Sequence, residues 1–415
     1  MLALHGGSPL RTKPFSRWPE HGPEEVAAVS RAVESGRWGG YPPPGPETAR
    51  FQEAFGAYLG AQHVVLAANG TVTLKVALRA LGVGAGDEVI VPALTWVATA
   101  GAAVYLNAVP VFADVDPETL CIDPRSVEAN ITPKTKAIIC VHLGSVMSDL
   151  DALSAIAKKH GLFLIEDCAH AHGMRWRGQG AGTIGHAGSF SFQSSKLLTS
   201  GEGGAITTQD PVLWQKCQSM VNCGRKEGAY AGFEGNFFSW NDRITELQSA
   251  LLSAQLARLE GQQARRAQNL AHLQKRLAEL VDIGLTIQRA DARMSSRAFY
   301  QLVLLYDAAK WKGLSRDKLV DALEAEGVPV DGGFYVPIPD RIDEIFPLRA
   351  KDYPEIRARY GEALSPRQLE LPVARKAAYE RTLWLHHALF LGSTSDIDDI
   401  VAAFLKVREH VDALL

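Results

Sequence analysis

The chain has 415 residues, a length that suits two domains or one large domain with a smaller companion. Apolar residues make up 47% of it and charged residues 21%, as in ordinary globular proteins. Because the formal net charge is only −3, the composition predicts no general attraction to nucleic acid or to anionic membranes.

The cysteines and the N-terminus indicate a protein of the cytoplasm. The five cysteines are odd in number and show no CxxC spacing, so reduced, buried thiols are expected, with neither a disulfide framework nor a zinc site. The first residues lack the basic region and the long apolar run of a signal peptide. No apolar stretch approaches the ~18 residues that a membrane helix needs.

Residues 1–45 are rich in glycine and proline and predict an irregular arm around one short helix, Glu24 to Glu34. Strand-like and helix-like runs then alternate, with helices expected at Thr71–Leu81 and Leu150–His160. Several strand candidates are continuous apolar runs, typical of parallel strands covered on both faces. The expected strands are Glu88–Val91, Val109–Ala113, Ala137–His142, Leu162–Asp167, Gly188–Phe192 and Gly204–Thr207. This alternation predicts a doubly wound α/β domain.

A long helical stretch over residues 242–281 follows, in which Gly261 is a candidate interruption. A strand-like run and a helix, Ser315 to Glu326, come next, and Ser315 could cap that helix. The order of elements predicts two domains. Residues 1–281 form a large α/β domain with the arm and an interdomain helix, and residues 282–415 form a smaller α+β domain.

Lys196 and Asp167 are the leading candidates for catalysis. Lys196 follows a run of alternating serine and phenylalanine, and Asp167 ends an apolar strand. A lysine that binds pyridoxal 5′-phosphate (PLP) covalently needs an acid that keeps the pyridine nitrogen protonated, so that the ring can accept electrons. A solvated loop lysine and a strand-end aspartate would be the common interpretation of an isolated pair, but the residues around these two favour the catalytic one.

Further residues could complete a cofactor site. Gly70 and Thr71 open a helix after an apolar run, and a helix N-terminus binds phosphate well, although an ordinary N-cap looks the same. The Ser191 hydroxyl could reach the same phosphate. Trp96, at a strand end, could stack on a cofactor ring or belong to the core.

Other sequence patterns are weaker evidence for a functional site. The glycines of Gly82-x-Gly84-x-Gly86 follow a helix and precede a strand, so they predict a helix end and a turn and no dinucleotide loop. His170 and His172 lie beside Asp167, but they lack further ligands at a useful spacing, so no metal site is predicted. His170 could contact the cofactor instead. The adjacent His386 and His387 are either structural or in contact with substrate.

Together, these motifs resemble the DegT/DnrJ/EryC1/StrS family of PLP-dependent aminotransferases, which act on keto sugars and keto cyclitols. The resemblance extends from Thr48 to about Leu405. It implies the aspartate aminotransferase fold (fold type I), with a large mixed-sheet α/β domain and a smaller C-terminal α+β domain. It also implies a homodimer with active sites at the subunit interface. The matching segments are Asn69–Thr71, Gly86–Pro92, Glu166–Gly173, Ser189–Lys196, Gly201–Gly204 and Asn241–Gln248.

The resemblance assigns roles to these residues. Lys196 would bind PLP as an internal aldimine and act as general acid and base, while Asp167 would pair with the pyridine nitrogen. Trp96 would stack on the ring, and Asn241 would reach the phosphate from the neighbouring subunit. His170 stands where many members have glutamine. The phosphate would be held by Gly70, Thr71 and Ser191.

Two segments, Pro372–Glu380 and Trp384–Gly392, resemble the aminocyclitol branch of the family. That branch aminates scyllo-inosose or 2-deoxy-scyllo-inosose with L-glutamine in the biosynthesis of aminocyclitol antibiotics. Ala169–Gly173 also resembles 3-amino-5-hydroxybenzoate synthases, which are related PLP dehydratases. An aminotransferase for nucleotide-linked keto sugars stays open as a third possibility, with Arg225, Lys226 and Arg243 as candidate contacts for phosphate.

Overall fold

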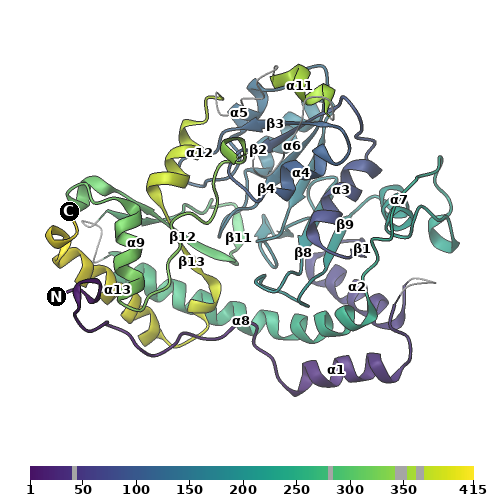
Figure 1. Cartoon of the computed structure of the whole chain (residues 1–415). Coiled ribbons are helices and arrows are strands. Elements are labelled where there is room, and N and C mark those ends of the chain that lie inside the picture. The colour runs from purple at the N-terminus through teal and green to yellow at the C-terminus, as the bar shows by residue number, and fades with distance from the viewer. Residues whose placement is uncertain (40–43, 279–283, 342–352, 361–368) are drawn as a thin grey trace.

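The computed structural model describes residues 1–39, 44–278, 284–341, 353–360 and 369–415. Helices cover a seven-stranded sheet in one half of the molecule (Figure 1). A second, three-stranded sheet lies in the other half, beside helices α9 (Arg316–Ala325) and α13 (Thr394–Glu409). The predicted arrangement of a large α/β part followed by a smaller α+β part is therefore present.

The main sheet has the order β1-β9-β8-β5-β4-β2-β3. Its strands are β1 (His63–Ala67), β2 (Glu88–Pro92), β3 (Val109–Ala113), β4 (Thr135–Val141), β5 (Phe163–Asp167), β8 (Ala187–Ser191) and β9 (Gly204–Thr208). All six predicted strands are confirmed to within two residues at each end. Neighbouring strands from β3 to β8 pair in parallel, whereas β9 is antiparallel to both of its neighbours. The sheet is therefore mixed, as the family resemblance implied.

The doubly wound pattern fails only at β9. Residues 192–203 join β8 to β9 and contain no helix. A parallel pair needs a crossover connection, usually a helix, whereas an antiparallel pair can be joined by a loop. This loop contains Lys196, and it reverses the direction of the chain between β8 and β9.

Helices that precede, separate and follow these strands cover the main sheet. They are α2 (Pro46–Leu59), α3 (Gly70–Ala80), α4 (Ala98–Val104), α5 (Pro124–Ala129), α6 (Leu150–His160) and α7 (Pro211–Val221). The predicted turn after α3 is confirmed, because Gly82 has φ 90° and Gly86 has φ 83°, a conformation that glycine adopts without strain. The arm helix, α1 (Pro23–Glu34), packs against α8 (Glu246–Ala278) through Ala28, Ala32 and Ala250.

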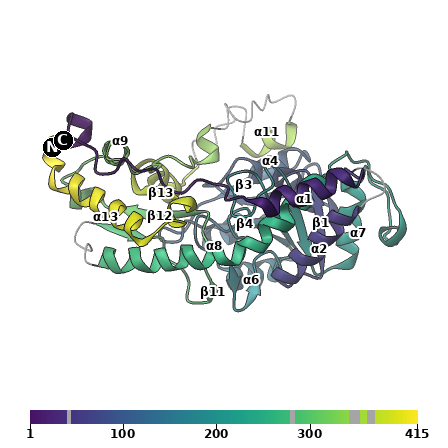
Figure 2. The same ribbon diagram turned by 90° about the horizontal axis from the view of Figure 1, so that it is seen from below.

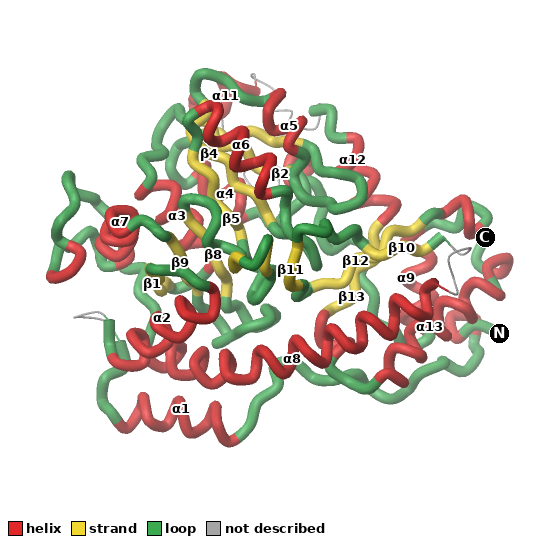
Figure 3. Tube along the Cα trace, turned by 180° about the vertical axis from the view of Figure 1, so that it is seen from behind, coloured by secondary structure: helices red, strands yellow, loops and turns green. Residues whose placement is uncertain are grey.

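Helix α8 runs beneath both halves of the molecule (Figures 1 and 3). The predicted interruption at Gly261 was wrong. This glycine is exposed, and a side chain at its position would meet no other atom, so its helical backbone is held by the turns on either side. The helix also begins later than predicted, because Thr245 pairs with Gly39 in an isolated bridge. Residues 279–281 of the predicted helix lie outside the described residues.

The second sheet is antiparallel and consists of β10 (Leu285–Ile287), β12 (Gln301–Tyr306) and β13 (Thr382–His386). The predicted cap of α9 is confirmed, since the Ser315 side chain accepts a hydrogen bond from the backbone N–H of Lys318. Short elements complete the described chain. Helix α11 (Pro354–Tyr360) packs against β3 of the main sheet, and α12 (Pro372–Lys376) follows it along the chain. A small sheet of β6 (Arg175–Trp176), β7 (Gln179–Gly180) and β11 (Met294–Ser296) joins segments of both halves.

The N-terminal arm ties the two halves together. Figure 2 shows it running from the end where α9 and α13 lie to α1, beside α8. Near its start, Arg11 forms a buried ion pair with Asp396 of α13, 2.7 Å long. All five cysteines are free thiols, as predicted. Among the described residues, no helix combines the length and the apolar character needed to cross a membrane.

Candidate active site

A cavity of about 730 Å³ opens at the carboxyl ends of the parallel strands. Val141 ends β4, Asp167 ends β5 and Ser191 ends β8, and all three line it. Open α/β sheets bind their ligands at this edge. The predicted site residues that line the cavity are Gly70, Thr71, Trp96, Asp167, His170, Ser191 and Lys196. The structure thus brings together all of the predicted site residues except Asn241.

Lys196 points its amine into this cavity, where Nζ lies 4.0 Å from the centre of the Tyr300 ring. Burial lowers the pKa of Lys196 to about 8, and the charge of Asp167 opposes that shift. A lysine with a lowered pKa spends more of its time as the neutral amine, which is the nucleophilic form. The environment of Lys196 therefore suits covalent binding of an aldehyde.

Asp167 is held as a buried acceptor. Its Oδ2 accepts a hydrogen bond of 3.0 Å from the Thr99 hydroxyl, and its Oδ1 accepts one of 3.2 Å from the backbone N–H of Ala169. Burial raises the pKa of Asp167, while these two hydrogen bonds and the charge of Lys196 oppose the rise. A buried carboxylate that lacks a direct cationic partner is suited to a positively charged ligand atom.

The first turn of α3 forms a close wall with β8. A Cβ atom on Gly70 would lie 2.7 Å from the Cβ of Ser191, so only glycine fits this position. The Asn69 side chain caps the helix by accepting from the N–H of Val72 at 2.9 Å. The N–H groups of Gly70 and Thr71 precede the first intrahelical hydrogen bond, and both residues line the cavity together with Ser191. This donor set fits the phosphate of PLP.

His170 is a neutral positioning residue. Its Nδ1 accepts the Gly144 N–H at 3.2 Å, so the ring proton lies on Nε2, which is 3.0 Å from the Tyr335 hydroxyl. Burial holds the pKa of His170 well below its usual range. The ring also lies 4.3 Å from that of Tyr300. His170 is therefore a neutral imidazole that supports the aromatic wall of the cavity.

His170 and His172 belong to no cluster of potential metal ligands among the described residues. His172 lies behind the cavity and packs against Phe190 and Phe192, with ring centres 5.5 and 5.8 Å apart. Within the described part of the chain, the cluster of potential ligands is His142, Glu166 and Cys168. The Glu166 carboxylate already accepts hydrogen bonds, from His142 and from the backbone N–H groups of Gly182, Ile184 and Gly185. This saturation marks the cluster as structural.

Sequence reasoning missed Thr99 and Tyr300. Thr99 lies one helical turn after Trp96, a spacing that could have indicated a shared site. Tyr300 precedes β12 of the second sheet, and no local pattern links it to Lys196. His386 and His387 were candidates for substrate contact, but neither is among the residues that line the cavity.

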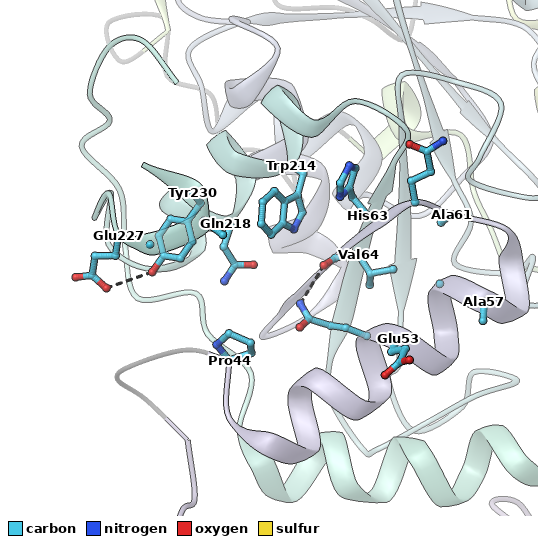
Figure 4. Close-up of a pocket in the computed structure, with 15 residues that line it drawn as sticks. Pro44, Glu53, Ala57, Ala61, His63, Val64, Trp214, Gln218, Glu227 and Tyr230 are labelled. Carbon is cyan, nitrogen blue, oxygen red and sulfur yellow. Dashed lines mark hydrogen bonds between the residues drawn. The ribbon is translucent and has the colours of Figure 1, made fainter. Parts of the chain in front are cut away.

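A second cavity, of about 590 Å³, lies between α2 and α7 (Figure 4). His63 and Trp214 stack on one another along its wall, with ring centres 5.3 Å apart, and Glu53 faces it from α2. Among the described residues, its lining contains no lysine or arginine and none of the predicted site residues. Those residues offer no amine that could bind an aldehyde covalently and no guanidinium for a phosphate, so the cavity with Lys196 is the better candidate.

Comparison with known proteins identifies the family of this chain. The family model of the DegT/DnrJ/EryC1/StrS aminotransferase family matches residues 19–403. A relative from Streptoalloteichus tenebrarius, provisionally named L-glutamine:3-amino-2,3-dideoxy-scyllo-inosose aminotransferase, is 48% identical over 100% of this chain and 99% of its own length. The L-glutamine:2-deoxy-scyllo-inosose aminotransferase of Streptomyces paromomycinus is 42% identical, over 99% of this chain and 98% of its own.

The fold agrees with these matches. The crystal structure of 3-amino-5-hydroxybenzoic acid synthase superposes with a TM-score of 0.79 at 31% identity, covering 96% of this chain and 100% of the other. The predicted fold class, fold type I of the PLP-dependent transferases, is thereby confirmed. With the family model and full-length relatives in agreement, the chain belongs to the DegT/DnrJ/EryC1/StrS family of PLP-dependent aminotransferases.

Proposed function

We propose that this enzyme transfers an amino group from L-glutamine to the ketone of a cyclitol of the scyllo-inosose type. The observation that carries the proposal is the meeting of Lys196 and Asp167 in one cavity that has few charges. The names of the full-length relatives supply the two substrates. Of the two ketones in those names, the 3-amino-2,3-dideoxy form is favoured, because the relative named for it is 48% identical and the other is 42% identical.

The proposed cofactor is PLP, bound covalently through Nζ of Lys196. Asp167 would hold a proton on the pyridine nitrogen, and Trp96, which is 60% exposed at the cavity, would cover the ring. The phosphate would lie against the N–H groups of Gly70 and Thr71 and the hydroxyl of Ser191. When bound, PLP supplies an electron sink for the carbon atom that loses its proton.

Lys196 would move the proton in both halves of the reaction. In the first half, its Nζ would take the proton from Cα of the amino donor and pass it to the C4′ carbon of the cofactor; in the second half, it would move a proton from that carbon to the acceptor carbon that receives nitrogen. The Tyr300 ring, 4.0 Å from Nζ, would stabilise the protonated amine between uptake and delivery of each proton. The Asp167 carboxylate keeps its hydrogen bonds to Thr99 and Ala169 throughout.

The charge of the cavity supports a free cyclitol over a nucleotide-linked sugar. Lys196 is the one lysine or arginine among the described residues that line it. A sugar nucleotide brings two phosphates, which bind best to arginine or lysine clusters. The candidate phosphate contacts Arg225 and Arg243 do not line the cavity of their own chain, and both donate to the side chain of Asn222.

The second half-reaction tests the acceptor. Enzyme carrying the aminated cofactor is offered 3-amino-2,3-dideoxy-scyllo-inosose, 2-deoxy-scyllo-inosose or a dTDP-linked keto-hexose, and the visible absorbance of the cofactor is followed. We expect the cyclitol ketones, the amino-dideoxy form fastest, to restore the original absorbance. Restoration by the nucleotide sugar alone would overturn the cyclitol assignment and leave the aminotransferase assignment intact.

We also propose a homodimer in which Asn241 completes the partner's site. Asn241 is exposed and does not line the cavity of its own chain. Its neighbours Phe238 and Trp240 are 87% and 55% exposed, as expected for residues that another subunit covers.

Complementation tests this shared site. A Lys196→Ala protein and an Asn241→Ala protein, each weak alone, should regain activity in mixed dimers, because one of the two sites then has both residues intact. Mixing Lys196→Ala with Asp167→Asn is the matched control and should restore nothing, since those residues belong to one chain's site. Absence of recovery in the first mixture, with mixed dimers demonstrated, would mean that each site is built from one chain.

The division into domains 1–281 and 282–415 is likewise proposed. It is supported by the second sheet and by a separate hydrophobic cluster that includes Phe299, Trp311 and Phe404. That cluster also takes in Leu270 and Leu273 of α8, so the helix contributes to both domains. The boundary itself falls in residues 279–283, outside the described part of the chain.

A further inference from the structure

Three side chains from distant parts of the sequence meet behind the Lys196 loop. Trp18 comes from the N-terminal arm, Arg266 from α8, and His387 from the 3₁₀ turn that follows β13. The Trp18 and His387 rings meet edge to face with centres 4.5 Å apart, and the Arg266 guanidinium lies 5.3 Å from the centre of the Trp18 ring. Arg266 and His387 are fully buried, and Trp18 is half-buried above them.

The cluster holds the two backbone carbonyls that precede Lys196. The indole Nε1–H of Trp18 donates to the carbonyl of Ser194 at 3.0 Å. Nε2 of His387 lies 3.0 Å from the carbonyl of Ser195. On the cavity side, the Ser195 hydroxyl is 2.7 Å from the Tyr300 hydroxyl. The chain is therefore fastened from both sides immediately before the lysine.

The protonation state of His387 follows from its neighbours. Arg266 can only donate hydrogen bonds, and its Nη2 lies 2.9 Å from Nδ1 of His387. Nδ1 must therefore accept, and the one ring proton lies on Nε2, where it can be donated to the Ser195 carbonyl. Burial, with the Arg266 charge adding to it, holds the pKa of His387 well below its usual range. Arg266 thus fixes the tautomer that the loop requires.

We propose that the Trp18–Arg266–His387 cluster positions Lys196 for reaction, as a set of positioning residues that contact neither substrate nor cofactor. The proposal rests on the proposed role of Lys196 as the lysine that binds PLP. Because Nζ must reach first the aldehyde carbon and then the substrate carbons, the backbone that carries it has to stay in one place. Docking of the N-terminal arm thereby supports reactivity at a site to which the described residues of the arm contribute no lining.

The test uses cofactor-free protein and two measurements. One is hydrogen–deuterium exchange of the segment 193–198, and the other is the rate at which the protein captures added PLP. Trp18→Phe removes one donor and keeps the ring, and His387→Leu removes the other. We expect each to speed exchange in that segment and to slow capture by about fivefold, the effect of one lost hydrogen bond. His387→Gln, which keeps a donor and an acceptor, should restore most of the capture rate.

Trp38→Phe is the matched control. The Trp38 indole also donates to a backbone carbonyl, that of Val33, at 3.0 Å, and among the described residues Trp38 makes no hydrogen bond to the Lys196 loop. Trp38→Phe should leave both the exchange rate and the capture rate unchanged. If His387→Leu loses protection throughout the protein, Trp18→Phe and His387→Gln decide the positioning proposal.

Two results would contradict different parts of the account. If wild-type protein captures PLP at Lys196, shown by borohydride reduction and peptide mapping, but Trp18→Phe and His387→Leu match it in both measurements, the positioning proposal is wrong and the proposed function stands. If wild-type protein captures no PLP at Lys196, the proposed function fails, and the positioning proposal fails with it.

Discussion

Lys196→Ala should abolish transamination while leaving the protein folded. The loss should be on the order of 10⁴-fold or more, because one side chain both binds the cofactor and moves the proton. The protein should still fold, because the Lys196 side chain points into a cavity and the contact described for its Nζ is with the Tyr300 ring. Steady-state transamination rates and a thermal melt of the cofactor-free protein measure the two effects.

Lys196→Arg separates chemistry from charge. It keeps a cation above the Tyr300 ring, but a guanidinium is never a neutral amine at ordinary pH, so this variant should be as inactive as the alanine variant. Lys159→Ala, at an exposed lysine paired with Glu128, is the control and should keep the wild-type rate. Transamination by Lys196→Ala at more than a small fraction of that rate would remove Lys196 from the mechanism.

Asp167→Asn should lose on the order of 10³-fold in rate and still bind some PLP. An amide cannot hold a proton on the pyridine nitrogen as a carboxylate does, so the ring becomes a weaker electron acceptor. The phosphate contacts proposed for Gly70, Thr71 and Ser191 do not depend on this charge. Presteady-state rates of the two half-reactions, with PLP content measured alongside, would show a loss in chemistry with partial retention of the cofactor.

The same substitution makes a second prediction possible, on stability. Burial raises the folded-state pKa of Asp167, so the charged carboxylate costs folding free energy at pH values above its unfolded pKa. Replacing it with an amide of the same shape removes that cost. The cofactor-free Asp167→Asn protein should therefore melt at or above the wild-type temperature at neutral pH.

Asp412→Asn, at a surface residue paired with Lys312, is the control for both the kinetic and the thermal measurement. Near-normal kinetics in Asp167→Asn would mean that the cofactor ring is oriented otherwise.

The sequence predicted most of the main sheet because its signals are local. Strands such as Val109–Ala113 are apolar throughout, and they pair in parallel inside two layers of helices, where no polar alternation is needed. The direction of β9 could not be read in the same way, because apolar character does not distinguish parallel from antiparallel pairing. The continuity of α8 through Gly261 was also hidden, since a helix tolerates a glycine when tertiary packing holds the turns around it.

The candidate site likewise combines residues that local sequence signals predict with residues that they do not. Lys196, Asp167, Ser191 and Gly70 lie in or beside strands whose order along the chain brings their carboxyl ends to one edge, so their meeting could be expected. Tyr300 and His387 reach the Lys196 region from the second sheet, through contacts between residues more than a hundred positions apart in the chain. No pattern in the sequence encodes such a pairing. The contact of His387 with the carbonyl of Ser195 depends on how the two halves of the molecule pack together.

The most direct test of the account is to find where the cofactor is attached. Purified enzyme reconstituted with PLP is reduced with borohydride, digested and mapped by mass spectrometry. We predict a phosphopyridoxyl group on the peptide that contains Lys196, and loss of that label when L-glutamine is added before reduction. A label on another lysine, or an unlabelled Lys196 in enzyme that transaminates normally, would contradict the assignment of Lys196 as the catalytic lysine.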